Sequence, residues 1–130
     1  MSLISITRRK GLEFAIAVRD HSLTSDMSES DGGQDGGPSP SELLAGSLGV
    51  CVAMMVQLYC DRHGYNDGEV SATLTYELAE NPTRLGAVTI DLEIPRDVPE
   101  DRRDAIIRVA KTCPIHATLE QPPEIDLEIL

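Results

Sequence analysis

The sequence predicts one domain, spanning residues 1–130, of mixed helix and strand in the order strands, long helix, strands, helix, strand. The chain has 130 residues, 41% of them hydrophobic, which is the size and composition of a single globular domain. Several segments alternate apolar and polar residues, as half-buried strands do. The long apolar segment 40–63 carries the start and stop signals of a helix.

The N-terminal part predicts three short strands and a loop. Residues 3–8 and 12–19 are strand-like and flank a polar, glycine-containing turn at 9–11, and residues 21–27 can add a third strand. Residues 28–39, SESDGGQDGGPS, are rich in Gly, Ser and Asp and can bury little apolar surface. We therefore expect this segment to be a flexible loop inside the domain.

The segment 40–63 is well marked as a helix. Ser39 suits the N-cap, Pro40 suits the first helical position, and Glu42 completes a capping box with Ser39. Gly64 is placed to end the helix, which would be about 36 Å long at about 1.5 Å per residue. Its middle is apolar all round, so it needs cover on every side.

This all-round apolar helix has two interpretations. A membrane span is long enough, but small and polar residues dilute the run and no stop-transfer charges flank it, so we expect no membrane partner. A buried core helix fits better, although a short chain can hardly wrap it completely. Small residues at 45–47 and 49 would let a second backbone approach closely, which favours an obligate homodimer.

The second half of the chain predicts a hairpin, a helix and a terminal strand. Residues 70–78 and 87–94 alternate on either side of a turn at Asn81-Pro82. Residues 99–111 place apolar side chains on one side of a helix. Residues 125–129 alternate Ile or Leu with Asp or Glu, so we expect a strand with one buried face.

Charge and composition exclude several functions. The chain has 11 Lys and Arg against 22 Asp and Glu, and this net charge of −11 repels nucleic acids and anionic membranes. The N-terminal residues lack the apolar core of a signal peptide, so we expect a cytoplasmic protein. In that reducing compartment three cysteines are no structural disulfide framework, and any disulfide should be transient and catalytic.

Cys51 and Cys113 are the candidate redox residues. A peroxide-reducing cysteine attacks as a thiolate, becomes a sulfenic acid, and then condenses with a second thiol. Cys51 lies beyond the first turn of its helix in apolar surroundings, so its thiolate needs a cation from elsewhere. The candidates for this cation are Arg8, Arg9 and Arg19 on the N-terminal strands.

Cys113 has a different local environment. It precedes Pro114, which could open a short helix with Cys113 as its N-cap, and this position would stabilise the thiolate directly. Lys111 and His116 are close in sequence and could add to that effect. The local chemistry leaves open which of the two thiols attacks first.

Two separated motifs resemble those of the OsmC/Ohr family. Segments 40–45, PSELLA, and 49–54, GVCVAM, are similar to its first signature, and 113–116, CPIH, to its second. The resemblance implies an OsmC-like fold: an intertwined α+β homodimer in which antiparallel sheets enclose the central helices. It also implies a cofactor-free, thiol-dependent peroxidase for organic hydroperoxides, with Cys51 as the peroxidatic thiol and Cys113 as the resolving thiol.

The resemblance assigns roles to Glu42 and Arg9 as well. Glu42 stands at the motif glutamate, which in the peroxidases helps to hold a substrate-site arginine, and Arg9 is the closest match to that arginine. Arg9-Lys10-Gly11 differs from the usual Arg-Asp-Gly, and Glu42 lies one residue closer to Cys51 than is usual. These differences indicate the less characterised OsmC-like branch. Its expected partners are an organic hydroperoxide and a thiol reductant of unknown identity.

Two other functions fit the sequence. A non-catalytic dimer of the same fold could bind a small apolar ligand. Cys60 with His63, and Cys113 with His116, form two Cys-x-x-His pairs, a permitted spacing for a structural zinc site. Cys60 has no motif support and lies about 180° around the helix from Cys51, so we expect it to fill the core.

Overall fold

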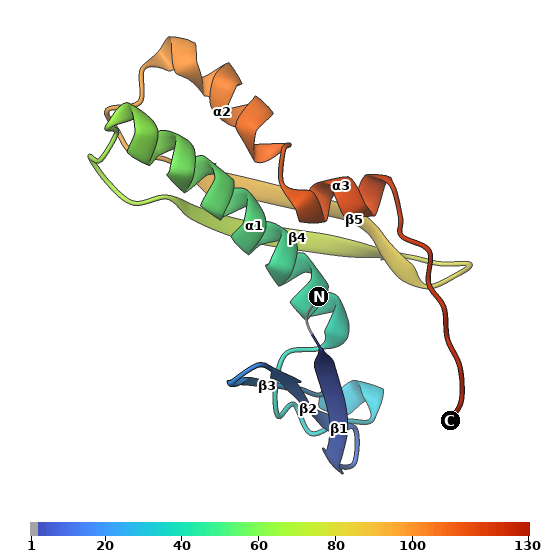
Figure 1. Ribbon diagram of the computed structural model, residues 1–130. Helices are drawn as coiled ribbons and strands as arrows, with labels where there is room; N and C mark the ends of the chain where they lie inside the picture. The colour runs from blue at the N-terminus through green and yellow to red at the C-terminus, as the bar shows by residue number, and fades with distance from the viewer. Residues whose placement is uncertain (1–2) are drawn as a thin grey trace. The chain divides into compact units, whose positions relative to one another are not determined.

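The computed structural model describes residues 3–130 (Figure 1). The chain divides into two compact units, residues 1–44 and 45–130. Strands, a long helix, strands and further helices follow one another, which confirms a mixed fold with antiparallel sheets and a long helix. The grouping of residues 1–130 into one domain stays a prediction.

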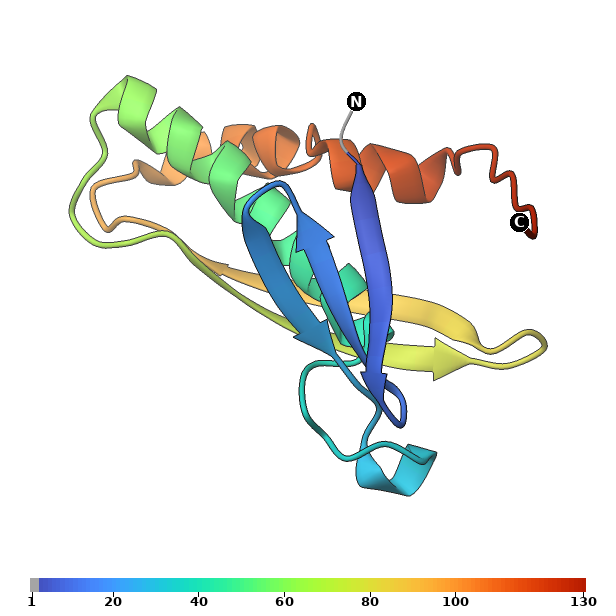
Figure 2. The same cartoon turned by 60° about the horizontal axis from the view of Figure 1, so that its bottom comes forward.

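The first unit contains an antiparallel three-stranded sheet in the order β1-β2-β3 (Figure 2). Its elements are β1 (Ile4–Lys10), β2 (Glu13–Val18), β3 (His21–Ser25) and a 3-10 turn, η1 (Glu29–Asp31). The three predicted strands are confirmed. However, β1 runs through Arg9, and the turn lies at residues 11–12. The pairing shifts register between Arg8 and Lys10, so Arg9 is a bulge within a strand and its predicted place in the turn is wrong.

The loop after β3 is organised around the carboxylate of Asp26, which is only 2% exposed. The carboxylate accepts hydrogen bonds from the backbone N–H groups of Met27, Gln34 and Gly36 at 2.7, 3.2 and 3.0 Å. These donors, Gly36 first, lower the pKa of Asp26 against the opposing effect of burial. Asp26 thus fixes two points of the glycine-rich loop, while the flexibility expected of residues 28–39 stays a prediction.

The central helix, α1, spans Pro40–His63, as predicted. Its capping box is formed: the Ser39 N–H donates to Glu42 Oε1 at 2.9 Å, and the Glu42 N–H donates to Ser39 Oγ at 3.2 Å. Gly64 has φ +72°, the left-handed conformation that commonly ends helices. One face of α1 is buried, with the residues Ala45, Leu48, Gly49, Val52, Val56 and Cys60.

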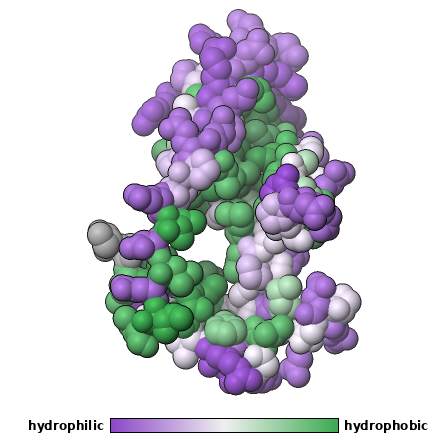
Figure 3. Space-filling view, turned by 90° about the vertical axis from the view of Figure 1, so that its right-hand side faces the viewer, coloured by the Kyte–Doolittle hydropathy of each residue, from purple (hydrophilic) through white to green (hydrophobic). Residues whose placement is uncertain are grey.

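A second apolar stripe of α1 is exposed. Its large side chains are 41% to 59% exposed, and they are Leu44, Val50, Met54 and Leu58. Exposed apolar surface is typical of interaction sites. Figure 3 shows hydrophobic residues in green on one face of the chain. Among residues 3–130, α1 is also the one helix long and apolar enough to cross a membrane, a test that core helices of water-soluble proteins pass too. Within the second unit, α1 is therefore covered on one side only.

The second unit packs α1 against a two-stranded antiparallel hairpin and two further helices (Figure 1). Its other elements are β4 (Ser71–Ala79), β5 (Arg84–Glu93), the 3-10 turn η2 (Glu100–Arg102), α2 (Arg103–Ala110) and α3 (Pro114–Glu120). The predicted hairpin is confirmed, and the helix predicted over 99–111 starts as η2 and continues as α2. The buried core consists of Leu48, Val52, Val56, Cys60, Val98, Ile106, Ala110 and Cys113.

The predicted terminal strand is not formed. Residues 122–130 have neither helix nor strand, and Ile125, Leu127 and Ile129 are 82%, 84% and 95% exposed. A strand needs a neighbouring strand for its backbone hydrogen bonds, and none of the residues that the structure describes pairs with this segment. Alternation of apolar and acidic residues was therefore not enough to form a strand within one chain.

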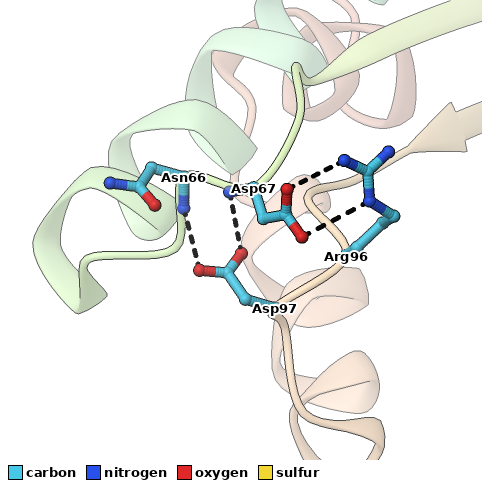
Figure 4. A network of polar contacts seen from close by, with 4 residues as sticks. All are labelled: Asn66, Asp67, Arg96 and Asp97. Atoms are coloured by element: carbon cyan, nitrogen blue, oxygen red, sulfur yellow. Dashed lines mark hydrogen bonds and ion pairs between the residues drawn. The ribbon is translucent and has the colours of Figure 1, made fainter.

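Asp97 joins the loop after α1 to the loop after β5 (Figure 4). Its carboxylate accepts hydrogen bonds from the backbone N–H groups of Asn66 and Asp67, both at 3.1 Å. The side chain of Asp67 forms an ion pair with Arg96 at 2.8 Å. The N–H donors, that of Asp67 first, hold the pKa of Asp97 below its usual range.

We expect Asp97→Ala to lower the melting temperature at pH 7, because two backbone N–H groups lose their acceptor. The pKa of Asp97 is lower in the folded chain, so its stabilising effect is present above the unfolded pKa of about 3.9 and is lost as the pH falls through the folded pKa. Thermal unfolding at pH 7 and at about pH 2 should show the difference from wild type shrinking in acid. Asp91→Ala, an exposed position on β5, is the control. Equal melting temperatures of wild type and Asp97→Ala at pH 7 would contradict the role of Asp97.

Candidate functional site

Cys51 and Cys113 come together within the second unit. Cys51 lies on α1 and packs against the core cluster that contains Cys113, which directly precedes α3. Both cysteines are free. Cys51 is partly exposed, whereas Cys113 is 0% exposed. The pair therefore combines a partly exposed cysteine with a fully buried one.

Cys113 is the N-cap of α3, as predicted. Its Sγ accepts a hydrogen bond from the His116 N–H at 3.4 Å, and Pro114 occupies the first turn. Burial above all, and then the hydrogen bond with Cys51, raise the pKa of Cys113, and they outweigh the N–H groups of His116 and Ile115. The N–H groups at the N-cap favour the Cys113 thiolate, as expected, but burial is the larger effect and the pKa of Cys113 is raised.

Glu42 is exposed in the first turn of α1, where Ser39 engages its carboxylate. The backbone N–H of Ser39, followed by its hydroxyl, lowers the pKa of Glu42. Among the described residues Glu42 takes part in no ion pair. The contact that the structure shows for Glu42 is thus the capping box.

The contacts of Arg9 are with residues other than Glu42. Its Nη1 donates to Thr24 Oγ1 at 2.9 Å and lies 4.0 Å from Glu13 Oε2. Arg9 and Glu42 both belong to the first unit, but no ion pair joins them in the described part of the chain. A β-bulge can redirect a side chain at the edge of a sheet. The sequence did not predict the bulge at Arg9.

Cys60 is fully buried in the core. Burial first, and then the charges of Asp61 and Asp97, raise its pKa, so its environment is that of a core-filling thiol. The His63 ring stacks on Tyr59 and its Nδ1 lies 2.9 Å from the Tyr59 carbonyl oxygen. No three His, Cys, Asp or Glu side chains among residues 3–130 are grouped as metal ligands. The structural zinc site that the two Cys-x-x-His pairs could form therefore has no cluster of ligands among these residues.

A groove of about 480 Å³ opens between α1, β5, α2 and α3. Its walls are mostly apolar and are formed by Leu48, Val52, Val88, Ile90, Leu92, Ile107, Ala110 and Leu119. Lys111, His116 and Glu120 add the charged or titratable groups, and His116 Nε2 lies 2.9 Å from Glu120 Oε1. Sequence reasoning did not identify Glu120, although its i,i+4 spacing from His116 is a signal for such a pair.

Several solved structures are similar to this chain, and a search of curated proteins found no match. A Psychrobacter arcticus protein has 20% identity and a TM-score of 0.83, covering 91% of this chain and 88% of its own. An OsmC-like protein from Mycoplasma pneumoniae has 18% identity and a TM-score of 0.78, with coverages of 94% and 89%. OsmC from Legionella pneumophila, an organic hydroperoxide resistance protein, has 19% identity and a TM-score of 0.72, with coverages of 92% and 88%. At these identities the likeness shows a shared fold.

The family is identified by a match between the sequence and a family model. The family model described as OsmC-like protein matches residues 32–128, a range that includes both α1 and the Cys113 segment. The predicted α+β OsmC-like fold of the subunit is confirmed by the similar structures, while the homodimer stays a prediction. The chain therefore belongs to the OsmC family of OsmC-like proteins.

Proposed function

We propose that this protein is a cysteine-based, thiol-dependent peroxidase that reduces organic hydroperoxides. The neighbouring pair of free cysteines carries the proposal, because Cys51 is partly exposed whereas Cys113 is fully buried in the core against which Cys51 packs. Cys51 can meet a substrate, and Cys113 is held beside it out of solvent. Similar structures from Legionella pneumophila and Elizabethkingia anophelis are organic hydroperoxide resistance proteins, which supports the proposal.

In the first step the Cys51 thiolate attacks an oxygen of the hydroperoxide, and the O–O bond breaks. The peroxide leaves as an alcohol after it gains a proton, and Cys51 becomes a sulfenic acid. In the second step the Cys113 sulfur attacks the Cys51 sulfur, the S–O bond breaks, and water leaves. A thiol reductant then returns the disulfide to two thiols. The contact between Cys51 and Cys113 means that the second step needs no large movement of the chain.

Arg9 and Glu42 enter the proposal through the family resemblance. A cation close to the Cys51 sulfur would favour its thiolate, and we propose Arg9 for this role, with Glu42 to orient it. Arg9 would exchange its contacts with Thr24 and Glu13 for this position. Ser39 holds the Glu42 carboxylate through one oxygen, which leaves the other oxygen for a guanidinium.

We further propose a cytoplasmic homodimer in which a second copy covers the exposed stripe of α1. Burying a large aliphatic side chain contributes about 1.5–3 kcal/mol, and the stripe has four such side chains, Leu44, Val50, Met54 and Leu58. The unpaired segment 122–130 also lacks the strand neighbour that its alternation fits. A second copy of the chain would cover the exposed stripe of α1 and would offer a strand neighbour to the segment 122–130.

Met54→Glu should weaken the dimer at least about 10-fold, because it would bury an unpaired carboxylate in an apolar contact. Met54 is 59% exposed in the single chain, so the substitution should leave the fold of the subunit intact. Sedimentation velocity over a concentration series measures the effect. Thr89→Glu, which adds the same charge on the exposed side of β5, is the control. A wild type that stays monomeric, or a Met54→Glu variant that dimerises equally well, would contradict the interface.

A second candidate function is a dimer that binds a small apolar ligand and uses neither thiol. It is favoured by an apolar cavity of about 490 Å³ in the first unit, lined by Ile6, Leu12, Phe14, Ile16, Ser25, Asp26, Met27, Pro40 and Leu43. A cavity of this volume is large enough for a drug-sized ligand. This candidate keeps the fold and omits the redox chemistry.

Hydroperoxide consumption separates the two candidates. Purified protein with a dithiol reductant should consume cumene or tert-butyl hydroperoxide catalytically, and the thiol pair should be recovered as a disulfide when the reductant is left out. Absence of consumption, with both thiols still free by mass spectrometry, would overturn the peroxidase and leave the ligand-binding candidate.

A further inference from the structure

Cys113 must lose a proton before its sulfur can attack the sulfenic acid, and it is fully buried. We infer that His116, oriented by Glu120, accepts this proton during disulfide formation. The inference rests on the proposed thiol cycle and supplies the base for its second step.

Backbone geometry places His116 next to the reacting sulfur. Its N–H donates to Cys113 Sγ at 3.4 Å, so the two residues belong to the same first turn of α3. His116 is three residues after the N-cap, and side chains at this position can reach back to the cap, as in a capping box. Pro114 fixes the backbone between them. The imidazole is therefore tied to the turn that holds the thiol.

The ion pair with Glu120 prepares the imidazole to act as a base. His116 Nε2 lies 2.9 Å from Glu120 Oε1, so Nε2 carries the hydrogen and, in the neutral ring, Nδ1 keeps its lone pair. In the described part of the chain, Nδ1 of His116 has no hydrogen-bond partner. A nucleophile, a base and a carboxylate that orients the base form the arrangement by which enzymes activate weak nucleophiles.

The charged side chains of the groove are Glu120, which contacts the His116 ring, and Lys111. The walls that α1 and β5 contribute to the groove are apolar, and the ionisable group that α1 brings to Cys113 is the thiol of Cys51. His116 is 33% exposed, so its proton can exchange with solvent water.

The step balances without an outside oxidant or reductant. His116 takes the proton from the Cys113 thiol while the Cys113 sulfur forms a bond to the Cys51 sulfur. The S–O bond breaks, and the hydroxide that leaves takes a proton from the imidazolium and departs as water. The Cys113 sulfur is oxidised, and the sulfenic sulfur of Cys51 is reduced.

The test measures disulfide formation in a single turnover, by acid quenching and mass spectrometry. His116→Gln should slow this step at least about 10-fold near pH 7 and leave the formation of the sulfenic acid unchanged. In the variant the rate should rise only at high pH, toward ionisation of the Cys113 thiol, whose pKa is raised, and the wild type should not share this steep dependence. Glu120→Gln should give a smaller loss with the same change in profile.

His63→Gln, which changes a histidine at the far end of α1, is the matched control and should leave both rates unchanged. Unaltered rates and pH profiles in His116→Gln and Glu120→Gln would overturn the inference. A parallel arm uses diamide, which oxidises Cys51 to an adduct that Cys113 then displaces. If hydroperoxides do not react with Cys51, the proposed function fails, while the diamide arm still shows whether His116 assists Cys113.

Discussion

Cys51→Ser should reduce hydroperoxide consumption to the rate without protein, a loss of at least about 1,000-fold, since removal of a catalytic nucleophile typically has effects of this size or larger. Cys51 is the partly exposed member of the pair and Cys113 is fully buried, so we expect the peroxide to react at Cys51. A serine hydroxyl does not form the anion that attacks an O–O bond at neutral pH. Steady-state turnover with a dithiol reductant measures the loss.

Cys113→Ser should have a different effect. Cys51 should still consume about one equivalent of hydroperoxide in this variant, because the first step needs only one sulfur. The sulfenic acid should then accumulate, since no second thiol lies beside it to form the disulfide. Trapping with dimedone and intact-mass measurement would detect it. The opposite pattern, with Cys113→Ser inactive in the first step and Cys51→Ser active, would reverse the assignment.

Cys60→Ala is the matched control for both substitutions. Cys60 lies on α1, as Cys51 does, but it is fully buried in the core and its environment disfavours ionisation. Its removal should leave turnover unchanged. Equal losses in all three cysteine variants would show that the substitutions act through folding, and the redox assignment would lose its support.

Local signals were sufficient to predict α1 and the N-cap of α3. The capping box of Ser39 and Glu42 and the left-handed Gly64 fix the ends of α1 by hydrogen bonds within a few residues. Cys113 is the N-cap of α3, since the following Pro114 suits the first position of a helix. Such features depend on neighbours in the sequence, and therefore the sequence alone reveals them.

Features that depend on distant residues were not predictable in the same way. The pKa of Cys113 follows from burial by α1 and α2, which no local pattern reports. The segment 125–129 has the alternation of a strand, but a strand also requires a partner, and alternation does not identify one. The bulge at Arg9 depends on its pairing with β2. In the candidate site, sequence patterns thus identified the two cysteines, and packing raises the pKa of Cys113.

Ile106→Ala should destabilise the protein by about 2–5 kcal/mol, the range measured for removing a large aliphatic side chain from a packed core. Ile106 is 2% exposed and packs in the cluster that contains Cys113 and Ala110. The substitution should leave a cavity beneath α2, the helix that leads into the Cys113 turn. We therefore expect it to loosen the thiol pair as well, with faster alkylation of Cys113 in the native protein.

Ile107→Ala is the matched control, because it removes the same atoms from the adjacent position of α2, where the side chain is 50% exposed. Its effect should stay within about 1 kcal/mol, since most surface changes are small. Urea unfolding of the two variants at one protein concentration gives the comparison and also holds any effect of subunit association constant. If Ile106→Ala were no more destabilising than Ile107→Ala, then the core around Cys113 would not be close-packed. Burial would then no longer explain why that thiol keeps its proton.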